Sequence, residues 1–159
     1  MATYNKFNSA IEDLLEGINL QSDALPVGLW VPGAPTAPNA ADNVVDTSTT
    51  PCTLKATTNI LEIAAGNGYT KKGIALTVTT KGQTSGTYTL AANQAVWTCV
   101  TAAMASFRYV VLFDDTAGAA ATRPVIAWWD YGATVTLNPG ETFTVKFNNT
   151  DPGTIFTGA

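Results

Sequence analysis

The sequence predicts a mainly β fold, an antiparallel β-sandwich or jelly roll with one N-terminal α-helix and a long proline-rich arm. Three observations lead to this fold class. After residue 60, apolar and polar residues alternate in short runs, the pattern of half-buried strands. Turn signals separate these runs about every 8–12 residues, a spacing typical of sandwiches. Most of the 26 threonines lie in this region, and threonine fits a pleated sheet surface.

The composition limits both the size and the function of the protein. A chain of 159 residues is enough for a single domain with a real core. Apolar residues make up 46% and charged residues only 13%, which argues against disorder. The net charge is −4 and the basic residues are scattered, so we expect no nucleic-acid partner. No apolar run approaches the roughly 20 residues that span a bilayer, so we expect no membrane partner.

Residues 1–20 predict the N-terminal helix. Their apolar side chains recur at spacings of three and four, which places them on one face. A helix this short is marginal alone, so its apolar face must dock on the sheet or on another subunit. The residues on this face are Phe7, Ile11, Leu14, Leu15 and Ile18.

Residues 21–59 predict an extended arm or loop. The segment is rich in proline, which breaks strand ladders, and most of it has no helical period. Residues 27–31, which include Leu29 and Trp30, are compatible with one short strand. Two interpretations remain open for the rest: an arm that lies across a neighbouring subunit, or a mobile surface loop.

Residues 60–159 predict the β-sandwich, within a chain that forms a single domain overall. Residues 107–113 and 124–131 are apolar on both faces, which indicates central strands. The last run has one wet face, and the Asn138–Glu141 turn precedes it. The further strand candidates are 74–79, 88–90, 96–101, 135–137 and 142–148.

Histidine is absent, which excludes Ser-His and Cys-His nucleophiles from this chain. We therefore expect no enzyme and no cofactor. Asp114 and Asp115 are expected to begin a turn and accept its backbone N–H groups. If Asp130 lay beside them, the three acids would form a calcium site or, less plausibly, a hydrolase site. Neither cysteine is in a Cys-x-x-Cys pair, so zinc is not expected.

Two further features involve charged and aromatic residues. Arg108 interrupts an apolar strand and needs a carboxylate partner, for which Asp130 is the candidate in a structural ion pair. Trp128 and Trp129 are adjacent, so they face opposite sides of a strand. Either both faces are covered, or one tryptophan meets another subunit. A third interpretation is a sugar-stacking platform that uses Trp97, Trp128 or Trp129.

Several blocks of sequence resemble a group of small virion proteins of tailed bacteriophages. The strongest are residues 107–116 and 123–132, and residues 4–7, 63–69 and 140–145 add to the match. The resemblance implies a capsid decoration (cement) protein on the capsid exterior of the virion, made in the bacterial host cytoplasm. Its implied partners are the major capsid protein and further copies of itself, as a dimer or trimer. A tail, collar or fibre component and a carbohydrate-binding module are the alternatives.

Large apolar side chains are the candidates for packing or for the interface with such partners, since an adhesive protein uses apolar contact surfaces. These candidates are Phe7, Ile11, Leu14, Leu15, Leu29, Trp30, Trp128 and Trp129.

Overall fold

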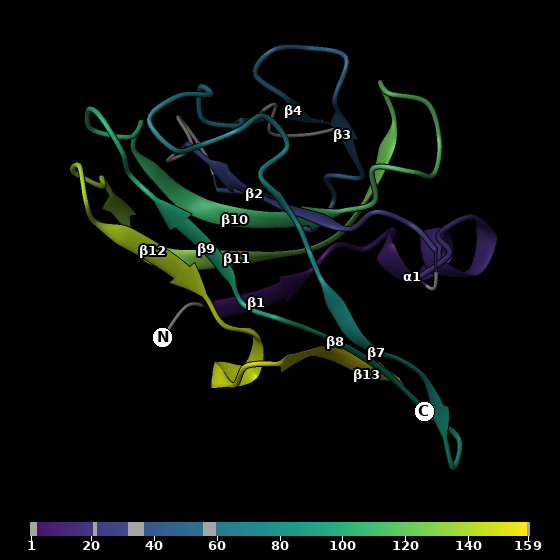
Figure 1. Cartoon of the computed structure of the whole chain (residues 1–159). Helices are drawn as coiled ribbons and strands as arrows, with labels where there is room; N and C mark the ends of the chain where they lie inside the picture. The colour runs from purple at the N-terminus through teal and green to yellow at the C-terminus, as the bar shows by residue number, and fades with distance from the viewer. Residues whose placement is uncertain (1–2, 21, 32–36, 56–59, 159) are drawn as a thin grey trace.

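The structure is a computed structural model that describes residues 3–20, 22–31, 37–55 and 60–158 (Figure 1). Strands account for 47% of it and helices for 7%, and every strand pairing is antiparallel. The predicted mainly β class with one short helix is therefore confirmed. A jelly-roll topology is not confirmed.

The main sheet has β10 and β11 at its centre. Its order is β5-β4-β3-β11-β10-β2-β6, and β1 pairs with β11 beyond the end of β3. Alternate residues of β10 face different clusters: Tyr109, Val111 and Phe113 belong to one, while Val110 and Leu112 face the other side. The strands are β1 (Thr3–Lys6), β2 (Pro26–Trp30), β3 (Val44–Asp46), β4 (Thr53–Lys55), β5 (Ile60–Leu61), β6 (Ile74–Ala75), β10 (Phe107–Phe113) and β11 (Arg123–Val135).

The main sheet curls until its β5 end returns to β2. A β-bridge joins Trp30 and Glu62, the N–H of Val31 donates to the carbonyl of Leu61 at 3.0 Å, and that of Ile63 donates to Leu29 at 3.0 Å. These bonds pair backbone groups that an open edge would expose. One apolar cluster fills the curled sheet: Phe7, Ala10, Trp30, Val45, Cys52, Leu54, Ile60, Tyr109, Val111, Phe113 and Val125.

The expectation of an extended arm over 21–59 is not confirmed. In the described part of this segment, β2, β3 and β4 belong to the main sheet, and Val45 and Leu54 are fully buried. The strands are only three to five residues long, so their periodicity is too short to recognise beside the prolines. Residues 32–36 and 56–59 lie outside the described residues.

Two small sheets cover the other face of the main sheet. The first pairs β9 (Ala95–Thr98) with β12 (Thr142–Val145), and the second has the order β13-β8-β7. Its strands are β7 (Val78–Thr84), β8 (Thr87–Ala92) and β13 (Gly153–Gly158). Two clusters pack beneath them, around Trp97 and around Leu90. The sheets therefore form a sandwich-like stack, from which the β7–β8 hairpin extends away (Figure 1).

The N-terminal segment is shorter as a helix than the predicted 1–20. Residues Thr3–Lys6 form β1, and only Ala10–Glu16 form the helix α1. Tyr4 pairs with Trp129 on β11, so backbone pairing at this sheet edge outweighs the helical pattern of residues 3–6. Phe7 precedes the helix and is fully buried in the core.

Candidate binding surfaces

An exposed apolar surface lies where α1 meets β13. Leu15 is 83% exposed and Ile11 is 48% exposed, although both are large apolar side chains. Two adjoining hollows, of about 370 and 520 Å³, share Leu14 and Phe156. We call this area the α1–β13 surface and define it by Ile11, Leu14, Leu15, Tyr88, Ile155 and Phe156.

The helix exposes these residues because its short length lets only one side reach the sheet. Ala10 is buried against the core, and Ile18, just after the helix, is buried as well. Ile11 and Leu15 are four residues apart, so they lie together on the face turned from Ala10. Ile11 and Leu15 are thus the part of the predicted apolar helix face that stays on the surface.

Three other candidates are core residues. Phe7, Leu29 and Trp30 are each fully buried, so they contribute packing and no contact surface. Trp128 and Trp129 are half-buried on opposite sides of β11: Trp128 packs on Phe7, with ring centroids 6.4 Å apart, and Trp129 on Phe147 at 5.6 Å. Each tryptophan thus packs on its own side of β11 against another part of this chain.

The alternative in which Asp130 lies beside Asp114 and Asp115 does not occur. Tyr109 at the start of β10 pairs with Asp130, whereas Phe113, the last residue of β10, pairs with Val125. Because the strands are antiparallel, Asp130 lies at the opposite end of β10 from Asp114. A calcium or hydrolase site that combines Asp114, Asp115 and Asp130 is therefore wrong.

Asp130 instead faces Arg108. Two hydrogen bonds of 2.8 Å join the guanidinium Nε and Nη2 atoms to the two carboxylate oxygens. The guanidinium also lies 5.3 Å from the centre of the Tyr109 ring. The pair holds the pKa of Asp130 below its ordinary value. It is partly exposed to solvent, so its contribution to stability is small.

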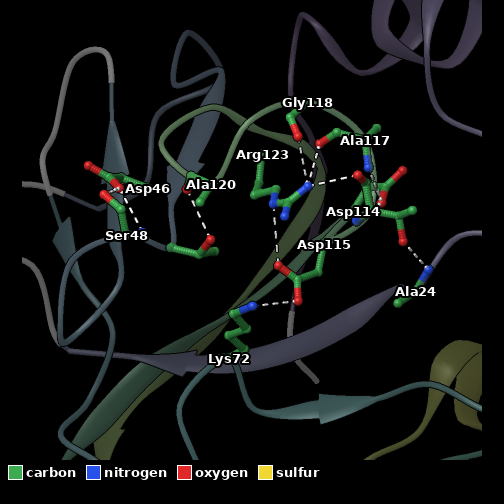
Figure 2. A network of polar contacts seen from close by, with 12 residues as sticks. Ala24, Asp46, Ser48, Lys72, Asp114, Asp115, Ala117, Gly118, Ala120 and Arg123 are labelled. Atoms are coloured by element: carbon green, nitrogen blue, oxygen red, sulfur yellow. Dashed lines mark hydrogen bonds and ion pairs between the residues drawn. The ribbon is translucent and has the colours of Figure 1, made fainter.

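Asp114 and Asp115 organise the loop after β10 (Figure 2). Asp114 is fully buried, and its Oδ1 accepts from the N–H groups of Thr116 at 2.6 Å and Ala117 at 3.1 Å. Asp115 lies between two cations, 2.7 Å from Lys72 Nζ and 3.4 Å from Arg123 Nε. Arg123 Nη1 also donates to the carbonyls of residues 116, 117 and 118. Asp114 thus has the turn-forming role expected for both acids, whereas the carboxylate of Asp115 is paired with the side chains of Lys72 and Arg123.

Replacing Asp114 by asparagine is expected to stabilise the protein at neutral pH. Burial raises the pKa of Asp114, and the nearby Asp23 carboxyl raises it further, against the two backbone donors. Because folding raises the pKa of Asp114, its contribution to stability is fully present below its unfolded pKa of 3.8. That contribution is lost as pH rises through the pKa of Asp114 in the folded protein. Asparagine keeps the Oδ1 acceptor and removes the charge. We expect a Tm higher by about 2–4 °C at pH 7.

Thermal unfolding of both proteins at several pH values tests this result. The higher stability of Asp114→Asn should shrink as pH falls toward 3.8, because the wild-type carboxyl is then protonated and as uncharged as the asparagine amide. Asp115→Asn is the control, since that carboxylate has two cationic partners and should lose stability. A lower Tm for Asp114→Asn at pH 7 would contradict the assignment.

A buried polar cluster that the sequence reading missed lies beneath β2. Glu62 is 1% exposed; its Oε1 accepts from the Tyr69 hydroxyl at 2.6 Å and its Oε2 from the Cys52 N–H at 3.3 Å. The N–H of Leu29 donates to the same tyrosine oxygen at 3.0 Å. Burial, reinforced by Glu62, raises the pKa of the Cys52 thiol to about 12 and makes it a poor nucleophile. The sequence signal for this cluster is Glu62 itself, an acidic residue inside the apolar run 60–63.

The cluster around Glu62 is structural, because its hydrogen bonds tie β2 to the segment that closes the main sheet. Within the described parts of the chain, no group of three His, Cys, Asp or Glu side chains is arranged to hold a metal ion. None of the helices in those parts has the length and apolar character needed to cross a membrane. Comparisons with protein-family models, curated proteins and solved structures found no match to this chain.

Proposed function

We propose that this chain is a structural protein of a tailed-bacteriophage virion, a capsid decoration protein that attaches to the outer capsid surface and to copies of itself. The α1–β13 surface is the observation that carries this proposal. Within the described residues, Leu15 stays 83% exposed although it is a large apolar side chain. Contiguous exposed apolar surface typically marks a site of protein–protein contact.

The physical requirements of a decoration protein fit this surface. Burying Ile11, Leu15 and Phe156 against a partner removes apolar area from water, at about 25 cal/mol per Å². The acidic residues Glu12 and Glu16 on the same helix give the surface a charged rim. A weak individual contact becomes strong when many copies bind one shell, because each bound copy raises the effective concentration of the others.

The resemblance to phage virion proteins concerns the framework more than this surface. Its two strongest blocks cover β10 with its following loop and most of β11, the centre of the main sheet. The weaker blocks include most of β1 and all of β12. Ile11, Leu15 and Phe156 lie outside all of these blocks. The resemblance therefore bears on the framework, and the proposed surface rests on the exposure of its apolar side chains.

The test removes the apolar character of this surface without touching the core. We expect the wild-type chain to self-associate in sedimentation-velocity experiments and to bind capsids of the phage that encodes it. The double variant Ile11→Ser/Leu15→Ser should weaken both interactions by about tenfold or more, the effect of losing about 1.4 kcal/mol. Its Tm should change little, since both side chains are exposed.

Val100→Ser is the matched control. Val100 is 58% exposed but lies in a turn after β9, away from the α1–β13 surface, so its variant should bind like the wild type. A wild-type chain that stays monomeric at all concentrations and leaves capsids unbound would overturn the proposal. Cryo-microscopy that places the chain on the tail, the collar or a fibre would replace it with that location.

A further inference from the structure

A second hollow opens beside β11 and β12, next to the α1–β13 surface, and Tyr4 lines it as well as one of the hollows beside α1. Its volume is about 420 Å³, within the range of small-molecule sites. Tyr131 and Asn148 line this hollow and are not part of the two hollows beside α1. We call it the aromatic pocket, and its walls come from Tyr4, Val110, Trp129, Tyr131, Phe143, Thr144, Val145, Lys146, Asn148 and Asn149.

Four aromatic rings form the apolar wall of this pocket. Tyr4 and Trp129 meet edge to face, with ring centroids 5.6 Å apart and planes at 62°. Tyr131 meets Phe143 in the same way, at 5.7 Å and 73°. Tyr131 is nevertheless 51% exposed and Tyr4 is 44% exposed. The rings are thus held by their neighbours while part of their surface stays open to a ligand.

Polar residues also border this pocket. Thr144, Lys146 and Asn148 are all exposed, and they supply a hydroxyl, an ammonium and a carboxamide. Asn148 and Asn149 both adopt left-handed backbone conformations, with φ of 50° and 56°. Asparagine adopts this conformation more readily than other non-glycine residues, but usually as a single residue, so two in succession are uncommon.

We propose that the aromatic pocket binds one pyranose ring of a carbohydrate. A pyranose has an apolar C–H face, which suits an aromatic ring, and a rim of hydroxyl groups, which need donors and acceptors. Tyr131 offers the ring, and Thr144, Lys146 and Asn148 offer the polar partners. This joint arrangement of rigid aromatic wall and adaptable polar rim carries the proposal.

Other ligand classes fit the pocket less well. The described lining contains no carboxylate, so a divalent cation would find no negative charge there to balance its own. Lys146 is its only cationic side chain, which is too little for a polyanion. An acyl chain would leave the hydroxyl and amide groups of the rim without partners.

The carbohydrate site differs from the sugar platform that the sequence suggests. Trp97 is 2% exposed and packs inside the core, and Trp128 lies on the opposite face of β11. Only Trp129 of those three residues lines the pocket. Tyr131 was not a candidate, because its exposure depends on how β12 packs beside it.

Saturation-transfer difference NMR with simple sugars tests the proposal. The probes are the methyl glycosides of glucose, galactose, N-acetylglucosamine and rhamnose, together with octanoate as the acyl probe. We expect at least one glycoside to receive saturation at its ring C–H protons and octanoate to receive none. Tyr131→Ala should weaken that glycoside's binding by about tenfold or more, and Tyr131→Trp should restore it. Asn148→Gly, which keeps the left-handed backbone, should weaken binding too.

Tyr88→Ala is the matched control, because this half-buried tyrosine belongs to the α1–β13 surface. It should leave sugar binding unchanged, whereas Tyr131→Ala should leave self-association and capsid binding unchanged. The two proposals therefore succeed or fail separately. Absence of transfer to every glycoside, preferential binding of octanoate, or equal sugar binding by wild type and Tyr131→Ala would each overturn the carbohydrate site.

Discussion

Trp30→Ala is expected to lower the free energy of unfolding by about 3–5 kcal/mol, the usual cost of truncating a buried tryptophan. Trp30 is fully buried, with 0% solvent exposure, and belongs to the apolar cluster inside the curled sheet. Its backbone also forms the bridge to Glu62 that closes this sheet. The substitution therefore leaves a cavity at the point where two distant parts of the chain meet.

Urea unfolding of the wild type and the variant measures this loss. Leu15→Ala is the control: Leu15 is also a large apolar residue, but it is 83% exposed and its truncation should change stability by less than about 0.5 kcal/mol. Equal effects of the two substitutions would show that Trp30 is a surface residue and that the closed sheet is wrong.

Gly73→Ala is expected to cost about 2–5 kcal/mol, the sum of left-handed strain and overpacking. Gly73 has a φ of +76° and immediately precedes β6. A Cβ atom there would lie 2.0 Å from the carbonyl oxygen of Val27 and 2.6 Å from the Cα of Gly28, both in β2. Because the obstacle is backbone, relief requires β6 to separate from β2.

Two other glycines separate the strain from the clash. Gly86, at the tip of the β7–β8 hairpin, has a φ of +88° but open space around it, so Gly86→Ala should cost only about 1–2 kcal/mol. Gly82 has open space and no left-handed conformation, and Gly82→Ala should be close to neutral. Thermal unfolding of the three variants should rank them in this order. A Gly73→Ala protein as stable as the Gly86→Ala protein would refute the close approach of β6 to β2.

The sequence predicts best where a pattern repeats along one long element. β10 and β11 are seven and thirteen residues long, and their two-sided apolar character identified them as central strands. The short strands β3 and β4 have only three residues each, so the alternation of apolar and polar residues does not repeat often enough to be recognised. The strand state of β3 depends on pairing with β11, which is contributed by a distant part of the chain, and β4 pairs in turn with β3.

The candidate sites divide in the same way. Charge and periodicity suggested partners for Arg108, and the antiparallel register of β10 and β11 places Asp130 against it. The same register separates Asp130 from Asp114, which no local pattern could reveal. Which part of the helical stripe is exposed likewise depends on the docking of α1 onto the sheet, so Ile11 and Leu15 could not be distinguished from Phe7 by spacing alone.

The amino-acid sequence by itself determined the mainly β class, the single short helix and the lack of histidine chemistry, because composition and short-range periodicity act within a few residues. Only the tertiary structure decided that Glu62 is buried, that the main sheet closes at Trp30, and that Tyr131 borders a pocket with Asn148. Each of these depends on contacts between segments far apart in the chain. Such contacts are set by strand register and packing, which sequence spacing does not encode.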